Sequence, residues 1–133
     1  MMEKIRIRTF LMFQGQAEEA MKLYTTLFPN SEILEMSKYE EGQGGRVGDV
    51  LQATFTLNGV EYMCIDSPTD HDFTFTPSMS LYVDFDSEEE LDRVYERLSE
   101  GGKLLMPLDK QPFSKKFGWV EDRFGVSWQL NLK

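Results

Sequence analysis

The stretch GWVEDRFGVSW, residues 118–128, contains both tryptophans of the chain and a charged turn with a glycine on either side. Strand-like segments flank this turn near Asp122–Gly125, which predicts a β-hairpin. Because side chains alternate between the two faces of a strand, the two tryptophans need not share an environment. We expect Trp128 in a core covered by a helix, and Trp119, together with Phe117, in a concave site or at a subunit contact.

The same order of elements occurs twice along the chain. The segments AEEAMKLYTTLF (17–28) and SEEELDRVYERLSEGG (87–102) carry apolar residues at helical spacing. Each follows a strand-like segment and precedes a further strand and a hairpin. When the two segments are aligned, their apolar positions coincide: Ala20 with Leu91, Leu23 with Val94, Tyr24 with Tyr95, and Leu27 with Leu98. The pattern predicts an internal duplication with the order β-α-β-β-β.

Local signals mark the limits of these elements. Ser87 followed by Glu90 is typical of a helix N-terminus, and Gly101-Gly102 of a C-terminus. Asn58-Gly59 predicts a type I′ turn within LQATFTLNGVEYMCID.

We therefore expect an α+β fold, with residues 1–133 forming one domain of two βαβββ modules. The modules cover about 4–66 and 78–133, and a polar linker, 67–77, joins them. A glycine-rich segment, EEGQGGRVGD at 40–49, interrupts the first module. It is either a mobile flap or an ordinary long connection between strands.

Strand alternation predicts which residues face the helices: Leu51, Ala53, Phe55 and Leu57 in the first module, and Met79, Leu81, Val83, Phe85, Trp128, Leu130 and Leu132 in the second. The opposite faces carry Thr, Ser, Gln, Asn and Tyr instead of charged residues. That composition predicts either a concave binding site with a few hydrogen-bonding groups or a solvated sheet face.

Composition narrows the classes of partner. A net charge of -9 argues against nucleic acid and against anionic membrane surfaces, since both require a basic face. No apolar run is long enough to span a bilayer, and MMEKIRIRTF lacks the apolar segment of a signal peptide. A single cysteine, Cys64, fits a reducing compartment. We expect a cytoplasmic protein that binds a small molecule or another protein.

Three segments carry a resemblance to a known family: FLMFQGQAEEAMKLYTTLFPNSEI (10–33), TLNGVEYMCIDSP (56–68) and KFGWVEDRFGVSWQLN (116–131). The chain resembles the PhnB-like branch, often labelled demethylubiquinone methyltransferase-like, of the vicinal oxygen chelate superfamily. That superfamily includes glyoxalases, bleomycin-resistance proteins and dioxygenases. The resemblance implies paired βαβββ modules that form a cupped mixed sheet around a cavity, usually in a homodimer.

Metal enzymes of this superfamily hold a divalent ion in the cup through His and Glu ligands. The resemblance places the four ligand positions on Thr9, on Met63 or Cys64, on Ser80 and on Gln129. None of these is a histidine or a carboxylate, so we expect no bound metal and no other cofactor.

The family label names a methyltransferase, but the sequence lacks the glycine-rich turn of a nucleotide-like cofactor site. A nucleotide-like cofactor on a doubly wound sheet needs a glycine-rich strand-to-helix turn. Neither FQGQAEE nor FDSEEE, the two strand-to-helix steps, supplies one.

Acidic residues near the linker offer a possible cation site. Asp66, Asp70 and Asp72 could bind a cation together with Glu61, but their spacing matches no calcium loop. We expect them to be solvated linker residues.

Four further residues have both a functional and a structural interpretation. Cys64 could be a nucleophile, but no nearby histidine would activate it, so we expect a buried apolar role. The only histidine, His71, is expected to be exposed in the linker. Arg46 and Arg123 could clamp an anionic ligand at a pocket rim or simply face solvent.

These observations favour a protein that binds a small organic molecule in a metal-free cup. The alternatives are a divalent-metal lyase, isomerase or dioxygenase with atypical ligands, and a non-catalytic dimeric scaffold. The predicted ligand-binding residues are Thr9, Thr54, Tyr62, Cys64, Ser80, Tyr82, Phe117, Trp119 and Gln129.

Overall fold

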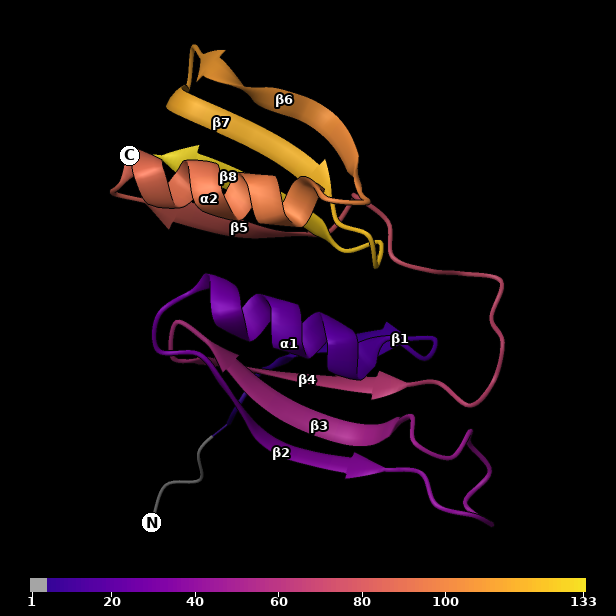
Figure 1. The fold of residues 1–133 in the computed structure, drawn as a ribbon. Helices are drawn as coiled ribbons and strands as arrows, with labels where there is room; N and C mark the ends of the chain where they lie inside the picture. The colour runs from indigo at the N-terminus through magenta and orange to yellow at the C-terminus, as the bar shows by residue number, and fades with distance from the viewer. Residues whose placement is uncertain (1–4) are drawn as a thin grey trace. The chain divides into compact units, whose positions relative to one another are not determined.

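The chain forms two units, each with one four-stranded sheet and one helix (Figure 1). The computed structural model describes residues 5–133, so residue 4, where the first module was expected to begin, lies outside it. The first unit ends at Asp70 and the second comprises His71–Lys133.

The first unit contains five elements: β1 (Thr9–Phe13), α1 (Ala17–Leu27), β2 (Glu32–Lys38), β3 (Val50–Leu57) and β4 (Val60–Asp66). Its strands lie in the order β1-β4-β3-β2. Strand β1 runs parallel to β4, and the other neighbours are antiparallel. Helix α1 contacts β2, β3 and β4.

The second unit repeats this arrangement with β5 (Ser80–Phe85), α2 (Glu88–Ser99), β6 (Lys103–Gln111), β7 (Ser114–Glu121) and β8 (Ser127–Leu132). The strand order is β5-β8-β7-β6, again with one parallel pair, β5 and β8. Helix α2 contacts all four strands. The predicted α+β fold, with the order βαβββ written twice, is confirmed.

The predicted turn and cap are also confirmed. Asn58 and Gly59 both have positive φ, 51° and 83°, as a type I′ turn requires. A Cβ on Gly59 would lie 2.9 Å from Nδ2 of Asn30, so a larger residue requires that side chain to shift. At α2, the Ser87 hydroxyl accepts a hydrogen bond from the backbone N–H of Glu90 at 3.2 Å.

The apolar stripe of each helix packs on one face of its own sheet. In α1 the four predicted stripe residues are at most 7% exposed, and in α2 Leu91, Val94 and Leu98 are fully buried. Trp128 is 1% exposed in the second core, as predicted. Met79 was wrongly assigned to that core: it precedes β5 and is 68% exposed.

In the second core, side chains pack closely against Gly118. A Cβ on Gly118 would lie 3.0 Å from the ring of Tyr95 and 3.2 Å from Leu108. The Tyr95 hydroxyl accepts a hydrogen bond from the Leu108 N–H at 3.2 Å. The ring therefore holds α2 against the backbone of β6 and β7.

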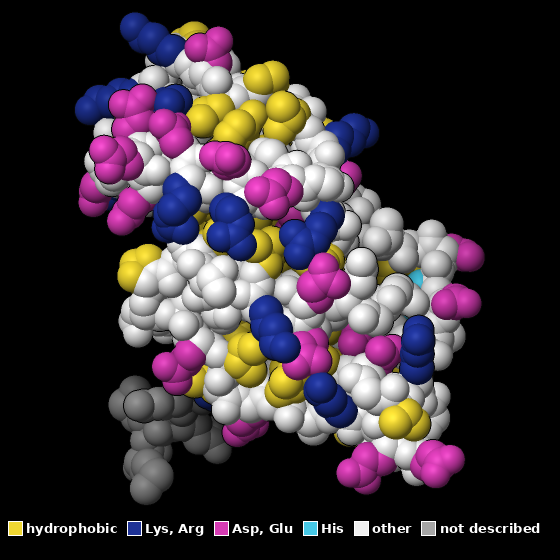
Figure 2. Space-filling model, viewed as in Figure 1, with side chains coloured by type: hydrophobic (Ala, Val, Ile, Leu, Met, Phe, Trp, Pro, Cys, Tyr) yellow, Lys and Arg dark blue, Asp and Glu magenta, His cyan; other side chains and the backbone are white. Residues whose placement is uncertain are grey.

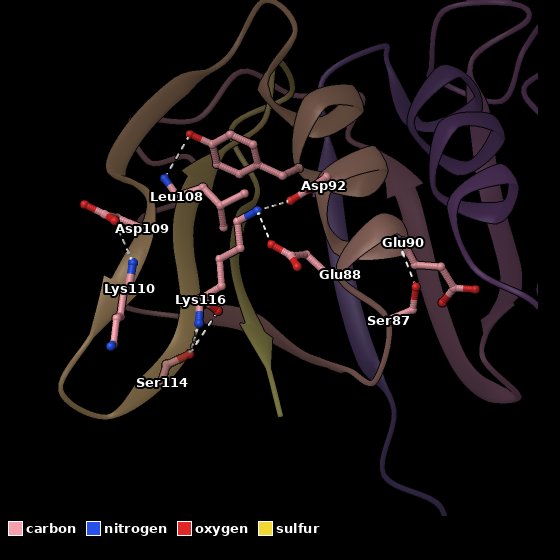
Figure 3. A network of polar contacts seen from close by, with 10 residues as sticks. Ser87, Glu88, Glu90, Asp92, Leu108, Asp109, Lys110, Ser114 and Lys116 are labelled. Carbon is pink, nitrogen blue, oxygen red and sulfur yellow. Dashed lines mark hydrogen bonds and ion pairs between the residues drawn. The ribbon is translucent and has the colours of Figure 1, made fainter.

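Lys116 forms a second link between α2 and β7 (Figure 3). Its Nζ lies 2.7 Å from Oδ1 of Asp92 and 3.0 Å from Oε2 of Glu88, one helical turn apart. Hydrogen bonding to Asp92, and then to Glu88, raises the pKa of Lys116. These two ion pairs connect the first turns of α2 to β7.

Asp66 is a buried structural residue, and its expected place in a solvated linker is wrong. It ends β4 and is 1% exposed. One carboxylate oxygen accepts the N–H groups of Gly15 and Ala17 at 2.8 and 2.9 Å, and the other accepts that of Val50 at 2.8 Å. The carboxylate thus caps α1, whose N-cap residue, Gln16, makes no side-chain cap.

The glycine-rich segment 40–49 joins β2 to β3 and is fastened at its base by Tyr39. The Tyr39 N–H donates to the Asp49 carbonyl at 2.9 Å, and its hydroxyl donates to the Asp66 carbonyl at 3.1 Å. Whether this segment acts as a flap stays a prediction.

Asp122 organises the hairpin between β7 and β8. It is 3% exposed, and its Oδ1 accepts the N–H groups of Phe124 and Val126 at 2.9 and 3.0 Å. Its Oδ2 accepts the indole N–H of Trp128 at 2.9 Å. One side chain therefore fixes both the turn and the largest core residue.

Charged side chains of both signs lie on the surface of the described residues. On the face shown in Figure 2, Asp and Glu side chains (magenta) lie among Lys and Arg side chains (dark blue). None of the helices within residues 5–133 is long and apolar enough to cross a membrane.

The Asp122 contacts make a stability prediction. Asp122→Ala leaves three buried N–H donors without their acceptor, each costing about 1 kcal/mol or more, so we expect a loss of at least about 3 kcal/mol in the free energy of unfolding. Urea denaturation measures this loss. Asp70→Ala, at an exposed position, is the matched control and is expected to change stability by less than about 0.5 kcal/mol. Equal effects of the two variants would contradict the role given to Asp122.

Candidate functional site

The candidate site is the face of β5, β8 and β7 that α2 does not cover, called here the uncovered face. Cross-strand partners share a face, so the register of the three strands identifies its residues. Ser80 pairs with Ser127, Tyr82 and Trp119 both pair with Gln129, and Asp84 and Phe117 both pair with Asn131. All of these side chains lie on the side opposite Trp128 and Leu130.

A chain of hydrogen bonds runs across the middle of this face. The indole N–H of Trp119 donates to the Ser127 hydroxyl at 2.8 Å. The hydroxyls of Ser127 and Ser80 lie 2.7 Å apart, and the side-chain N–H of Gln129 donates to Ser80 at 3.2 Å. The four side chains come from three strands, so the sheet itself sets their positions.

Aromatic rings border the hydrogen-bonded row. Tyr82 is 55% exposed, and its ring centroid lies 6.3 Å from that of Phe117. Phe113 contacts Phe117 edge-on at 5.0 Å and is itself exposed. Phe117 is therefore buried between two rings that solvent can reach.

Beyond the rings, a second polar group closes the face. The amide of Asn131 donates to Asp84 at 2.8 Å and accepts a short hydrogen bond from the Ser114 hydroxyl. A depression of about 430 Å³ lies beside it, lined by Phe113, Ser114, Asn131 and three lysines.

The structure brings together five of the predicted site residues: Ser80, Tyr82, Phe117, Trp119 and Gln129. Sequence reasoning missed Ser127 and Phe113. The alternation along SWQLNL placed Ser127 on this face, which was the available signal, but its central place in the row depends on pairing with β5. Phe113 lies outside the strands, in the turn between β6 and β7, and had no sequence signal.

In the first unit the predicted residues divide between two faces. Thr9 and Tyr62 are paired in register, and Tyr62 stacks on the buried Phe55 at 5.4 Å. Cys64 pairs with Leu11 and Ala53, both in the core under α1. Thr9, Tyr62 and Cys64 therefore lie on the face of the first sheet that α1 covers. The expected buried role of Cys64 is confirmed.

Thr54 does lie on the other side of the first sheet, where it pairs with Met63. Phe10, the register partner of Met63 on β1, shares this side and is 53% exposed. The resemblance left its hairpin position open between Met63 and Cys64, and residues one apart on a strand lie on opposite faces. The side chains on the open side are Met63 and Phe10, not Cys64 and Thr9.

Cys64 is fully buried, and its chemistry follows from that burial. Desolvation, with a smaller contribution from the charge of Asp66, raises the pKa of the Cys64 thiol to about 12. A neutral thiol is neither a good nucleophile nor a good metal ligand at neutral pH.

The metal chemistry of the superfamily does not fit the residues at its ligand positions. Ser80 and Gln129 are already hydrogen-bonded to each other, Thr9 faces α1, and the hairpin position offers a thioether or a neutral thiol. Within residues 5–133, no three His, Cys, Asp or Glu side chains gather as metal ligands.

The remaining candidates lie apart from the uncovered face. His71 stacks on Phe73 at 4.6 Å in the exposed linker, and Arg123 lies over the ring of Phe124 at 4.5 Å. Arg46 is exposed in the glycine-rich segment. Asp70 and Asp72 are also exposed.

Both helix N-termini are occupied by protein groups. The first N–H group of α1, that of Ala17, donates to Asp66, and α2 is capped by Ser87 and begins with three glutamates. Neither end resembles the glycine-rich, anion-binding turn of a nucleotide site.

Two units of order βαβββ, each with a mixed four-stranded sheet, define the glyoxalase, or vicinal oxygen chelate, class of fold. FosX, a fosfomycin resistance protein from Listeria monocytogenes, shares this fold at 13% identity with a TM-score of 0.64, covering 99% of this chain and 95% of that one. PA1353 from Pseudomonas aeruginosa shares it at 24% identity with a TM-score of 0.84, covering 98% of each chain.

The chain belongs to the 3-demethylubiquinone-9 3-methyltransferase family, whose model matches residues 5–131. It is similar to the PhnB protein from Bacillus cereus, at 59% identity and a TM-score of 0.95, over 97% of this chain and all of that one. The PhnB-like resemblance is thus confirmed. No protein with a curated description matches the chain.

The Cys64 environment makes a reactivity prediction. We expect the native thiol to react with 5,5′-dithiobis(2-nitrobenzoic acid) at pH 8 at least about 100-fold more slowly than the urea-unfolded chain, because thiolate is scarce and access is blocked. Absorbance at 412 nm follows the reaction. A native rate close to the unfolded rate would show that Cys64 is accessible.

Proposed function

We propose that the protein binds a small organic molecule on the uncovered face of its second unit, without a metal ion. The observation that carries this proposal is the hydrogen-bonded row Trp119–Ser127–Ser80–Gln129 beside the half-exposed ring of Tyr82. Apolar walls with a few fixed polar groups are typical of small-molecule sites.

Preorganisation distinguishes this face from an ordinary solvated sheet surface. Side chains on a solvated face are free to rotate, whereas Ser80 and Gln129 are held by bonds to neighbouring strands. The Gln129 Oε1 atom has no hydrogen-bond partner among residues 5–133 and remains available to a ligand. Groups fixed before binding lose less entropy when a ligand arrives.

A divalent-metal lyase, isomerase or dioxygenase remains the alternative function. It requires ligands that the superfamily positions do not supply here, since Ser80 and Gln129 are neutral and Cys64 is a protonated thiol under α1. No feature of the site favours it over metal-free binding.

Methyl transfer, the activity in the family name, is a further candidate. We expect no binding of S-adenosylmethionine, because neither strand-to-helix step, FQGQAEE or FDSEEE, supplies the glycine-rich turn on which a nucleotide-like cofactor binds. Isothermal titration calorimetry with S-adenosylmethionine is the direct check.

We also propose a homodimer, as the resemblance implies, in the cytoplasm. Exposed aromatic residues, including Phe10 and Phe113, are candidates for a subunit contact. Light scattering after gel filtration tests the dimer.

The binding proposal predicts a ligand-dependent rise in thermal stability. In a fluorescence-based screen of uncharged aromatic and carbonyl compounds, a compound bound on this face raises the midpoint of unfolding by mass action. Gln129→Ala and Tyr82→Ala are each expected to weaken binding of that compound by about tenfold, through loss of a hydrogen bond or a ring contact.

Gln52→Ala is the matched control, since Gln52 is an exposed glutamine on β3 of the first unit. It is expected to leave the ligand response unchanged. Equal weakening by the control, or a ligand response that survives both test variants, would remove the uncovered face as the binding site.

Metal content separates the proposal from its alternative. Protein purified without chelators is expected to contain much less than one equivalent of any transition metal by plasma mass spectrometry. One equivalent of tightly held metal, lost in both Ser80→Ala and Gln129→Ala, would favour the metal enzyme instead.

A further inference from the structure

In the hydrogen-bonded row on the uncovered face, the number of protons and lone pairs on each serine determines which group donates and which accepts. A serine hydroxyl has one proton to donate and two lone pairs that accept. Ser127 accepts from Trp119, Ser80 accepts from Gln129, and the two hydroxyls bond to each other at 2.7 Å. One proton of the two therefore lies between the serines, and the other points elsewhere.

Burial decides which proton is free. Ser127 is 1% exposed, whereas Ser80 is only partly buried. A buried hydroxyl proton requires an acceptor, and within residues 5–133 the acceptor seen for Ser127 is the Ser80 oxygen. Ser127 therefore donates to Ser80. With both lone pairs of Ser80 engaged, its own proton is left to point away from the sheet.

The neighbouring group has the opposite polarity. Gln129 uses its N–H to donate to Ser80, so its carbonyl oxygen, Oε1, is the atom left for a ligand. The face thus presents one donor, the Ser80 O–H, next to one acceptor, Gln129 Oε1. Both groups are uncharged.

We infer that this pair recognises an amide edge: a carbonyl oxygen that accepts from Ser80 beside an N–H that donates to Gln129. Primary carboxamides, lactams and cyclic imides carry this edge, and a planar one can lie against the exposed ring of Tyr82. A carboxylate of the same shape places a second acceptor against Gln129 Oε1 and adds charge to a chain of net charge -9. The site therefore selects neutral amides over the corresponding acids.

This inference rests on the proposed binding role of the uncovered face. Its test uses two matched pairs of probes, nicotinamide with nicotinate and benzamide with benzoate, in ¹⁵N-resolved NMR titrations of the full chain. The amides are expected to shift the Trp119 indole and Gln129 side-chain resonances, and to bind at least about tenfold more tightly than the acids, the scale of one lost hydrogen bond.

Gln129→Glu tests the direction of the row. A carboxylate at 129 accepts the Ser80 proton and removes the free donor, so amide binding is expected to fall at least about tenfold. Gln52→Glu makes the same change on the first unit and is expected to leave binding unaltered. Native spectral dispersion of both variants shows that they are folded.

The outcomes separate this inference from the function on which it rests. Acids that bind the face as tightly as the amides, or amide binding unchanged in Gln129→Glu, would overturn the amide-edge inference and leave small-molecule binding intact. If a ligand of another class binds this face and none of the four probes does, the amide-edge inference is likewise overturned and small-molecule binding is left intact. A face that responds to no compound at all would overturn both.

Discussion

The Asp122 carboxylate sets the register on which the second unit depends. By holding the N–H groups of the turn and the indole of Trp128, it fixes where β8 begins relative to β7. A strand shifted by one residue turns every side chain to the opposite face. The same carboxylate that buries Trp128 under α2 therefore also places Ser127 and Gln129 on the other side. The register that Asp122 sets for β8 therefore determines both the core and the candidate site of the second unit.

The first unit uses a buried carboxylate for a related purpose. Asp66 ties the end of β4 to the start of α1 and to the start of β3. Each unit thus has an acidic side chain that replaces water as the acceptor for three protein donors. Buried polar groups of this kind favour one arrangement of the chain because alternatives leave them unpaired.

The fold could be predicted from the sequence because its signals are local and repeated. Three signals depend only on residues near one another in sequence, and all three were confirmed: the apolar stripe Ala20–Leu27, the Ser87 cap and the Asn58-Gly59 turn. The site was predictable only where alternation along one strand suffices, as for Ser80, Trp119 and Gln129. In the first unit alternation did not suffice, because the resemblance left its hairpin position open between Met63 and Cys64, which lie on opposite faces. Asp66 was assigned to the linker because its donors, Gly15, Ala17 and Val50, are brought near only by folding. Asp122 was missed although its donors, Phe124, Val126 and Trp128, follow within six residues, because a strand pattern does not show which N–H groups a carboxylate accepts.

The central claim is that an organic molecule, not a metal ion, occupies the face bearing Ser80 and Gln129. High-resolution electron density for crystals of protein purified without chelators, and grown with a ligand found by screening, tests this most directly. The account predicts a molecule within hydrogen-bonding distance of Ser80 Oγ and Gln129 Oε1, with no ion between them. A metal ion coordinated by these two side chains, or a ligand bound elsewhere with this face filled only by solvent, would contradict it.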